Sequence, residues 1–168
     1  MARGLPESRC QSTVLNEREV GGEPVADLRV RSAPLTGIEI PEDLVPLAID
    51  EFPVLFIAAA CASGKTVLSG AEELRVKESD RIASMAEGLT RLGIENDVRE
   101  DGIAITGGQI TGGEVDTFHD HRIAMSFSVA ALRASGPIHV NDCDHVATSF
   151  PGFAAQARGV GLNIKEVN

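Results

Sequence analysis

Three cations stand among carboxylate and hydroxyl groups immediately ahead of an amphipathic segment. They are Arg75, Lys77 and Arg81, in the run 74–81. Cations are unfavourable at a helix N-terminus, by about 0.3–1 kcal/mol each. An anionic ligand reverses this cost, because it is attracted both by the cations and by the free backbone N–H groups. The run therefore predicts an anion site, in which the planar fork of Arg81 suits a carboxylate or phosphate.

Lys77 and Glu78 add chemistry to this run. Lys77 is a compact charge whose pKa moves if the amine is desolvated. Glu78 stands between cations, which favour its ionised form, and it can pass a proton in a dry site. The alternative is a solvated helix start with ion pairs inside the helix, which is the usual role of charge runs.

Two further predicted helices begin with functional groups. Arg122 follows Asp120 and His121 at the start of one, and Asp50 opens the most apolar helix in the chain. An exposed Arg122 paired with Asp120, or an Asp50 that only caps its helix, explains each motif taken alone. Together, two cationic helix starts and one acidic start predict a site for a small polyanion with a carboxylate base nearby. His121, beside Arg122, is a candidate lining residue.

Two motifs resemble sites without having the required context. The run 63–66 (Ser-Gly-Lys-Thr) resembles the end of a phosphate-binding P-loop. However, it leaves a helix and enters a strand, which is the reverse of the P-loop order. His119 and His121 alternate as metal ligands can, but no partner cluster has ligand spacing. We expect neither a nucleotide site nor a metal site, and no cofactor.

The elements that position these groups follow from the hydrophobic pattern. Alternation predicts a half-buried strand at 25–32, and helical spacing predicts an amphipathic helix at 79–92. Short strands are predicted at 66–68 and 138–140, a hairpin at 94–98 and 103–106, and helices at 52–62, from Asp120 to before Gly136, and at 149–158. The first 24 residues show no clear period. We therefore predict a loop-rich start over 1–24 and one partial domain over 25–168.

The chain contains an internal repeat with an offset of 72 residues. Residues 58–68 match residues 130–140, and each copy is an apolar helix, an Ala-Ser-Gly stop and a strand. The match indicates a duplicated α/β unit, although small-residue coincidence is the alternative. The same offset relates Asp50 to Arg122. We therefore expect both residues on one face, where helix N-termini converge.

Composition excludes several classes of protein. The 168 residues carry a formal charge of −10, which argues against binding nucleic acid or an anionic membrane face. No apolar run reaches the roughly 18 residues that a membrane helix needs, so no membrane association is expected. Cys10, Cys61 and Cys143 show no paired spacing, which favours a reducing cytoplasm without a disulfide or zinc framework.

The motifs resemble the 5-enolpyruvylshikimate-3-phosphate synthase family. The resemblance covers about residues 25–163 and rests on the runs 74–82 and 120–125, with 49–53 and 148–153 in the family's order. It implies an α/β fold of repeated β-α-β-α-β-β units in two domains, of which this chain holds most of one. It also implies transfer of the enolpyruvyl group of phosphoenolpyruvate to the 5-hydroxyl of shikimate 3-phosphate, with release of phosphate, in the shikimate pathway of aromatic amino-acid synthesis.

The resemblance also implies roles for individual residues. Asp50 takes the proton of the shikimate 5-hydroxyl, Lys77 lies at that hydroxyl and binds shikimate 3-phosphate, and Glu78 handles proton transfer at the methylene carbon of phosphoenolpyruvate. Arg81 and Arg122 clamp phosphoenolpyruvate, supported by His121. These roles agree with the chemistry inferred from the residues alone.

Two departures from the family pattern affect the interpretation. Thr148 stands where many members have a lysine, which leaves one phosphoenolpyruvate contact unfilled. Family chains are also much longer, so the resemblance implies a C-terminal portion, inactive without its N-terminal domain. Two alternatives remain at this stage: a nucleotide-sugar enolpyruvyl transferase, against which the positions of the cysteines argue, and a non-catalytic anion-binding module.

Overall fold

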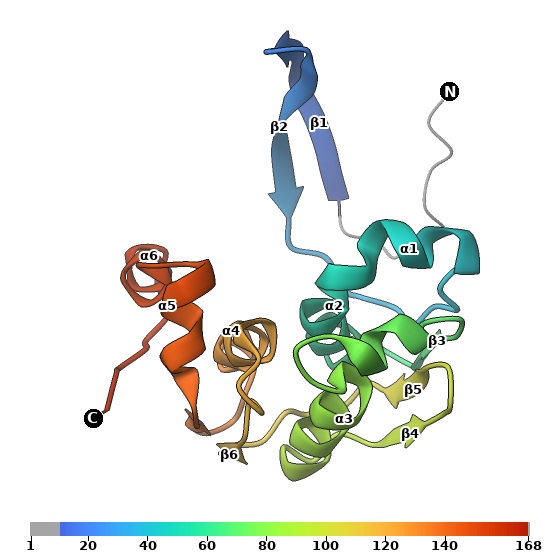
Figure 1. The fold of residues 1–168 in the computed structure, drawn as a ribbon, viewed down its shortest axis with the longest axis vertical. Coiled ribbons are helices and arrows are strands. Elements are labelled where there is room, and N and C mark those ends of the chain that lie inside the picture. Colours follow the sequence, from blue (N-terminus) through green and yellow to red (C-terminus); the bar gives the residue numbers. More distant parts are fainter. Residues whose placement is uncertain (1–10, 168) are drawn as a thin grey trace.

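The computed structural model describes residues 11–167, which form a projecting hairpin, a packed centre and two C-terminal helices (Figure 1). The hairpin joins β1 (Gln11–Val20) to β2 (Glu23–Arg31). The centre contains α1 (Val45–Ala48), α2 (Phe52–Ala60), β3 (Lys65–Leu68), α3 (Arg81–Arg91), β4 (Asn96–Val98), β5 (Ile103–Thr106), β6 (Gly113–Val115), α4 (His121–Ala130) and β7 (Ile138–Val140). The two C-terminal helices are α5 (Val146–Ser149) and α6 (Phe153–Gly159). The 3₁₀ turns lie at Glu42–Leu44, Ile49–Glu51, Glu72–Val76 and Cys143–His145.

The first half of the centre is one β-α-β-α-β-β unit. Residues 36–40 run parallel to β3, with hydrogen bonds from Val67 N to Ile38 O and from Ile40 N to Val67 O, both 2.9 Å. β3, β5 and β4 then form an antiparallel sheet in that order. Gly37 permits the close approach of the first segment, because a Cβ there would lie 2.4 Å from the Lys65 carbonyl oxygen.

The second half begins the same pattern again. β6 pairs with β7 in parallel, and α4 connects them. The order helix, stop and strand therefore occurs in α2–β3 and again in α4–β7, which confirms the duplicated unit that the 72-residue offset predicts. Together with the structural relatives described below, this arrangement confirms the expected fold class.

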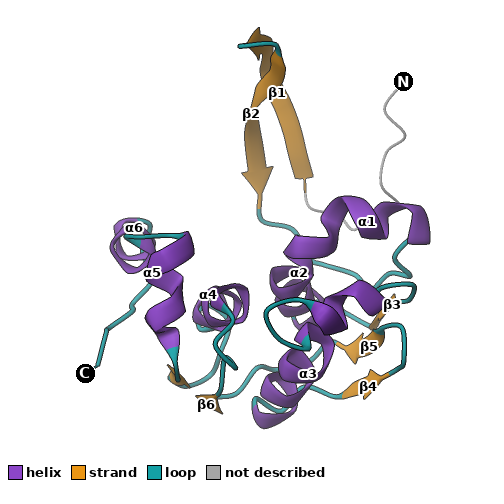
Figure 2. Ribbon diagram, in the orientation of Figure 1, coloured by secondary structure: helices purple, strands orange, loops and turns teal. Residues whose placement is uncertain are grey.

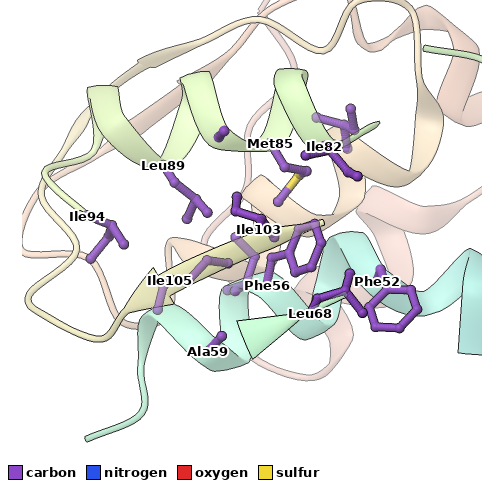
Figure 3. Packing of buried hydrophobic residues seen from close by; sticks show 14 of the residues in the cluster. Phe52, Phe56, Ala59, Leu68, Ile82, Met85, Leu89, Ile94, Ile103 and Ile105 are labelled. Carbon is purple, nitrogen blue, oxygen red and sulfur yellow. The ribbon is translucent and has the colours of Figure 1, made fainter. Parts of the chain in front are cut away.

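One hydrophobic core lies between the helices and the sheet. Figure 3 shows Met85 and Leu89 of α3 and Phe56 of α2 gathered with Ile103 and Ile105 of β5, and all five are buried. α3 and α4 meet where Gly88 faces Phe127: a Cβ at Gly88 would lie 2.2 Å from the tip of that ring. The packing of these two helices holds their N-terminal ends at fixed positions.

The prediction of a loop-rich start over 1–24 is wrong for residues 11–24, which belong to a β-hairpin closed by Gly21 and Gly22 (Figure 2). Residues 1–10 lie outside the described residues. Both glycines have positive φ, as a two-residue hairpin turn requires. The strand lacked a sequence period because neither of its faces is buried. The boundary predicted at residue 24 falls in this hairpin, next to the turn.

β2 confirms the strand predicted at 25–32 but not its half-buried state. Leu28 is 68% exposed and Val30 62%, since no element in the described part of the chain covers this face. The helix predicted at 149–158 is also wrong in its extent. The chain breaks between α5 and α6, where Gly152 adopts φ +91°, and only α6 continues the predicted helix.

The other predicted elements are confirmed within two residues at each end, except that α4 ends at Ala130 rather than just before Gly136. Over residues 11–167, no helix is long and apolar enough to cross a membrane. Cys61 and Cys143 are free thiols, and Cys10 falls outside the range that the structure describes.

Candidate active site

Three helix starts bring the predicted residues together. α2 follows the 3₁₀ turn that carries Asp50, α3 begins at Arg81, and α4 begins one residue before Arg122. Asp80 caps α3 by accepting a hydrogen bond from Ala83 N at 2.9 Å, and Asp120 caps α4. The expected convergence of Asp50 and Arg122 is confirmed: Arg122 Nη1 donates to the Asp50 carbonyl oxygen at 2.8 Å.

Arg81 lies at the centre of this cluster and is only 1% exposed. Its Nε donates to Asp120 Oδ2 at 2.8 Å, its Nη1 to Asp50 Oδ1 at 3.0 Å and its Nη2 to Glu78 Oε2 at 2.6 Å. Burial alone would lower the pKa of the guanidinium, but the three carboxylates raise it further above its ordinary value. Arg81 therefore connects all three helix starts and is permanently charged.

Asp120 is the buried partner of Arg81, with no exposed surface. It also accepts hydrogen bonds from Arg122 N at 2.9 Å and from Ser79 Oγ at 3.2 Å. Burial tends to raise the pKa of this carboxyl, but the hydrogen bond and charge of Arg81 outweigh it and hold the pKa below its usual range. Sequence reasoning identified Asp120 as a cap and missed its pairing with Arg81.

Asp50 faces three cations. Besides the bond from Arg81, its carboxylate lies 3.6 Å from Lys77 Nζ and 3.9 Å from Arg122 Nη2. Partial burial acts to raise its pKa, but the Arg81 hydrogen bond and the neighbouring positive charges lower it overall. Asp50 is therefore ionised at neutral pH and able to accept a hydrogen bond from a hydroxyl group.

Lys77 lies between Asp50 and Glu73. Its Nζ is 2.5 Å from Glu73 Oε1, and this hydrogen bond is the main reason that the pKa of the amine is raised. The lysine is thus an ammonium group, available to an anion. Glu78, which follows it, contacts Arg81 and lines an open hollow of about 400 Å³ beside α3, together with Ser79, Asp80, Ala83, Ser84, Glu87 and Phe118.

Arg122 is the outer arginine of the cluster. Its Nη1 also lies 3.0 Å from Glu51 Oε1, a contact that the sequence did not predict. His121, the first residue of α4, is half-buried and directly precedes Arg122 in the chain. In the described part of the chain it makes no side-chain hydrogen bond.

Thr148 replaces the lysine that many family members have, and it lies in α5. Its Oγ1 donates a hydrogen bond to the His145 carbonyl oxygen at 2.7 Å, so the hydroxyl bonds within its own helical segment.

Arg75 does not belong to the anion site that the run 74–81 predicts. Its Nη1 donates to Asp80 at 2.7 Å and its Nε to the Glu100 carbonyl oxygen at 2.7 Å, and it also donates to the carbonyl oxygen of Arg99. It therefore ties the start of α3 to the turn between β4 and β5. Of the three cations in the run 74–81, only Lys77 and Arg81 face Asp50.

Lys65 of the P-loop-like run and His119 both have exposed side chains. Lys65 is exposed at the start of β3, after the helix rather than before one. His119 Nδ1 lies 3.2 Å from His145 Nε2, and both rings are exposed. Within residues 11–167, no group of three or more His, Cys, Asp or Glu side chains is arranged to hold a metal ion.

The cluster is a set of cations neutralised by the chain's own carboxylates. Lys77, Arg81 and Arg122 each contact at least one of Asp50, Glu51, Glu73, Glu78 and Asp120. Such a site can bind an anion if some of these carboxylates move aside, and the carboxylates that stay in place can then accept or donate protons. Anion binding and proton transfer are thus the chemistry that it supports.

Comparison with known proteins gives a consistent result. The family model described as EPSP synthase (3-phosphoshikimate 1-carboxyvinyltransferase) matches residues 12–156. The 3-phosphoshikimate 1-carboxyvinyltransferase of Methylococcus capsulatus is 64% identical over 161 residues, which are 96% of this chain and 37% of that protein. The protein of the same name from Alkalilimnicola ehrlichii is 66% identical over 150 residues, which are 89% and 34%.

Solved structures agree. EPSP synthase from Acinetobacter baumannii superposes with a TM-score of 0.91 at 56% identity, covering 94% of this chain and 38% of that one. The enolpyruvyl transferase NikO from Streptomyces tendae has a TM-score of 0.61 at 22% identity, covering 94% and 34%, which shows the shared fold alone. The chain thus spans little more than a third of the length of the curated relatives it matches.

Proposed function

Since this chain belongs to the EPSP synthase family, we propose that it forms part of a 3-phosphoshikimate 1-carboxyvinyltransferase and supplies one side of its active site. The reaction transfers the enolpyruvyl group of phosphoenolpyruvate to the 5-hydroxyl of shikimate 3-phosphate and releases inorganic phosphate. No oxidant or reductant is consumed. The proton balance requires one group to take the hydroxyl proton and another to serve the methylene carbon.

The convergence of the three helix starts is the observation that carries this proposal. Arg81 and Arg122 stand on neighbouring helix starts, where an arginine pair can bind the carboxylate and phosphate of phosphoenolpyruvate. Their guanidinium groups are joined through Asp50: one donates to its carboxylate and the other to its carbonyl oxygen. The anion therefore binds beside a carboxylate, as enolpyruvyl transfer requires.

Asp50 is the proposed base for the shikimate 5-hydroxyl. Its lowered pKa keeps the carboxylate ionised and ready to accept that hydrogen bond. Lys77, 3.6 Å from it, is the proposed partner of shikimate 3-phosphate at the same hydroxyl. Glu78, which contacts Arg81 and borders the open hollow, is the proposed proton carrier at the methylene carbon, and His121 a supporting neighbour of Arg122.

The proposed partner of this chain is the remainder of the enzyme, preceding it in a longer polypeptide. Two observations support this: the relatives are almost three times as long as the matched segment, and the hairpin exposes Leu28 and Val30. The chain is then the C-terminal portion and is inactive alone. We place the enzyme in the cytoplasm, to which the free thiols of Cys61 and Cys143 are suited.

A chimera tests this proposal. This chain replaces the matching 161 residues of the Methylococcus capsulatus relative, and phosphate release is measured with phosphoenolpyruvate and shikimate 3-phosphate. We expect turnover by the chimera, none by the chain alone, and no turnover when a nucleotide sugar replaces shikimate 3-phosphate. A folded chimera without turnover, or robust turnover by the chain alone, would contradict the proposal.

A further inference from the structure

We propose that Glu51 and Glu73 are internal counter-ions that compete with the substrate anions, Glu51 at Arg122 and Glu73 at Lys77. This inference rests on the proposed function, because it takes Arg122 as a phosphoenolpyruvate ligand and Lys77 as a shikimate 3-phosphate ligand. It assigns a role to two carboxylates that the proposed proton transfers leave unused.

The geometry at Arg122 supports competition. Glu51 Oε1 lies 3.0 Å from Arg122 Nη1, the same nitrogen that donates to the Asp50 carbonyl oxygen. The Glu51 carboxylate thus occupies a position on the guanidinium that a substrate oxygen would use. Its side chain is 62% exposed, so it can rotate into solvent when an anion arrives.

The geometry at Lys77 is equivalent. Glu73 Oε1 lies 2.5 Å from Lys77 Nζ, closer than the 3.6 Å to Asp50 Oδ1. The Glu73 side chain is 60% exposed, whereas that of Lys77 is mostly covered. The hydrogen bond from Lys77 to Glu73 is also the main cause of the raised pKa of the lysine, in line with this short contact.

The two glutamates differ from the carboxylates around Arg81. Asp120 is fully buried and caps α4, so its removal disturbs the fold. Asp50 and Glu78 have proposed roles in proton transfer. Glu51 and Glu73 instead each pair with one outer cation and have a solvent-exposed side chain, so either can be neutralised without removing a fold contact or a proposed catalytic group.

The expected effects are small and have a defined sign. Exposed ion pairs stabilise proteins only slightly, by a free energy that corresponds to a factor of about 1.5 to 5 in an equilibrium constant. Removing a competitor of this strength lowers the KM of the matching substrate by the same factor. A glutamate that instead holds its cation in a productive position would raise that KM when it is replaced.

A crossed experiment in the active chimera tests the proposal. Glu51→Gln is expected to lower the KM for phosphoenolpyruvate by about 1.5- to 5-fold and leave that for shikimate 3-phosphate unchanged. Glu73→Gln is expected to do the reverse, and kcat stays constant in both. The matched control is Asp97→Asn, which also removes one negative charge. Asp97 lies in β4, and its Oδ2 forms an exposed ion pair with Arg99 Nε of the following turn at 3.5 Å.

The outcomes separate this inference from the function on which it rests. A chimera without turnover contradicts the proposed function before either glutamate is tested. In an active chimera, an unchanged or raised KM for the matching substrate overturns the counter-ion role. So does an equal decrease for both substrates in both variants and in Asp97→Asn, because this would be a general charge effect.

Discussion

The cluster at the helix starts and the β1–β2 hairpin both carry charged side chains, yet they use them in opposite ways. In the cluster, Arg81 and Asp120 form an ion pair at 2.8 Å, and their side chains are 1% and 0% exposed. In the hairpin, Arg18 and Asp27 are 3.7 Å apart, and more than half of each side chain is exposed. Only the first pair is fixed by surrounding structure.

The difference is one of support rather than of composition. α2, α3 and α4 share one buried core, so their N-terminal ends have fixed relative positions. The hairpin is held by its own strand pairing, and its apolar residues Val14, Leu28 and Val30 face solvent. We infer that the site half in this chain is preorganised, whereas the hairpin needs the remainder of the proposed enzyme to become rigid.

The largest expected difference between the regions is in activity. In the chimera, Asp50→Asn is expected to lower kcat by about 10²- to 10⁴-fold, because it removes the proposed base. Asp27→Asn makes the same chemical change in the hairpin and is expected to leave kcat unchanged. Steady-state phosphate release measures both, and equal losses in the two variants would show that the cluster has no special role.

The next comparison concerns stability. Asp120→Ala breaks a buried pair and removes the α4 cap, and it should lower the free energy of unfolding by about 3–5 kcal/mol. Asp27→Ala breaks an exposed pair and should cost at most about 1 kcal/mol. Urea unfolding of the chain, followed by circular dichroism, measures both changes. Similar values for the two variants would contradict the contrast in burial.

Acid should destabilise the folded chain through the carboxylates of the cluster. The pKa values of Asp50 and Asp120 are lowered in the folded chain, so their ionised forms stabilise it fully above the unfolded pKa of about 3.9. This stabilisation is lost as the pH falls through the lower folded values. Urea midpoints between pH 6 and pH 2 should therefore decline below about pH 4. The decline should be shallower in Asp120→Asn, and an identical decline would exclude this carboxyl as a source.

The smallest energies are those of local opening. Hydrogen exchange should be fast for the hairpin amides, because opening of an unsupported two-stranded ribbon requires little free energy. The amides of β5, which is paired on both sides by β3 and β4, should exchange slowly. Exchange measured on the chain and on the chimera sharpens the comparison: hairpin protection should increase in the chimera, and equal exchange in both would show that no other segment supports it.

Much of the cluster could be predicted from the sequence because its residues are local signals. Caps, apolar periods and a 72-residue offset located three helix starts, and these starts carry Asp50, Glu78, Arg81 and Arg122. Ion pairs between residues that are far apart in the sequence were harder to predict. The bond between Arg81 and Asp120 joins residues 39 apart, and no local pattern distinguishes it from the pairing of Asp120 with Arg122. The contact of Glu51 with Arg122 was equally hidden, because in the sequence Glu51 is simply a carboxylate at a helix start.

The errors in the fold have a related cause. Alternation predicted the β2 strand and assigned one face to a core, but burial depends on what covers a strand, which alternation alone does not reveal. β1 lacks alternation because both of its faces are exposed, and its Gly-Gly turn was the available signal. The break between α5 and α6 was signalled by Pro151 and Gly152, which the apolar spacing around them obscured.

Titration of the isolated chain with phosphoenolpyruvate, followed through the arginine side-chain NMR signals, tests the central claim most directly. The claim is that a preorganised anion site lies at the helix starts and not in the hairpin. It predicts saturable shifts of the Arg122 and Arg81 guanidinium signals, weaker shifts with inorganic phosphate, and no change at Arg18. Equal shifts at Arg18 and Arg122, or none at Arg122, would contradict it.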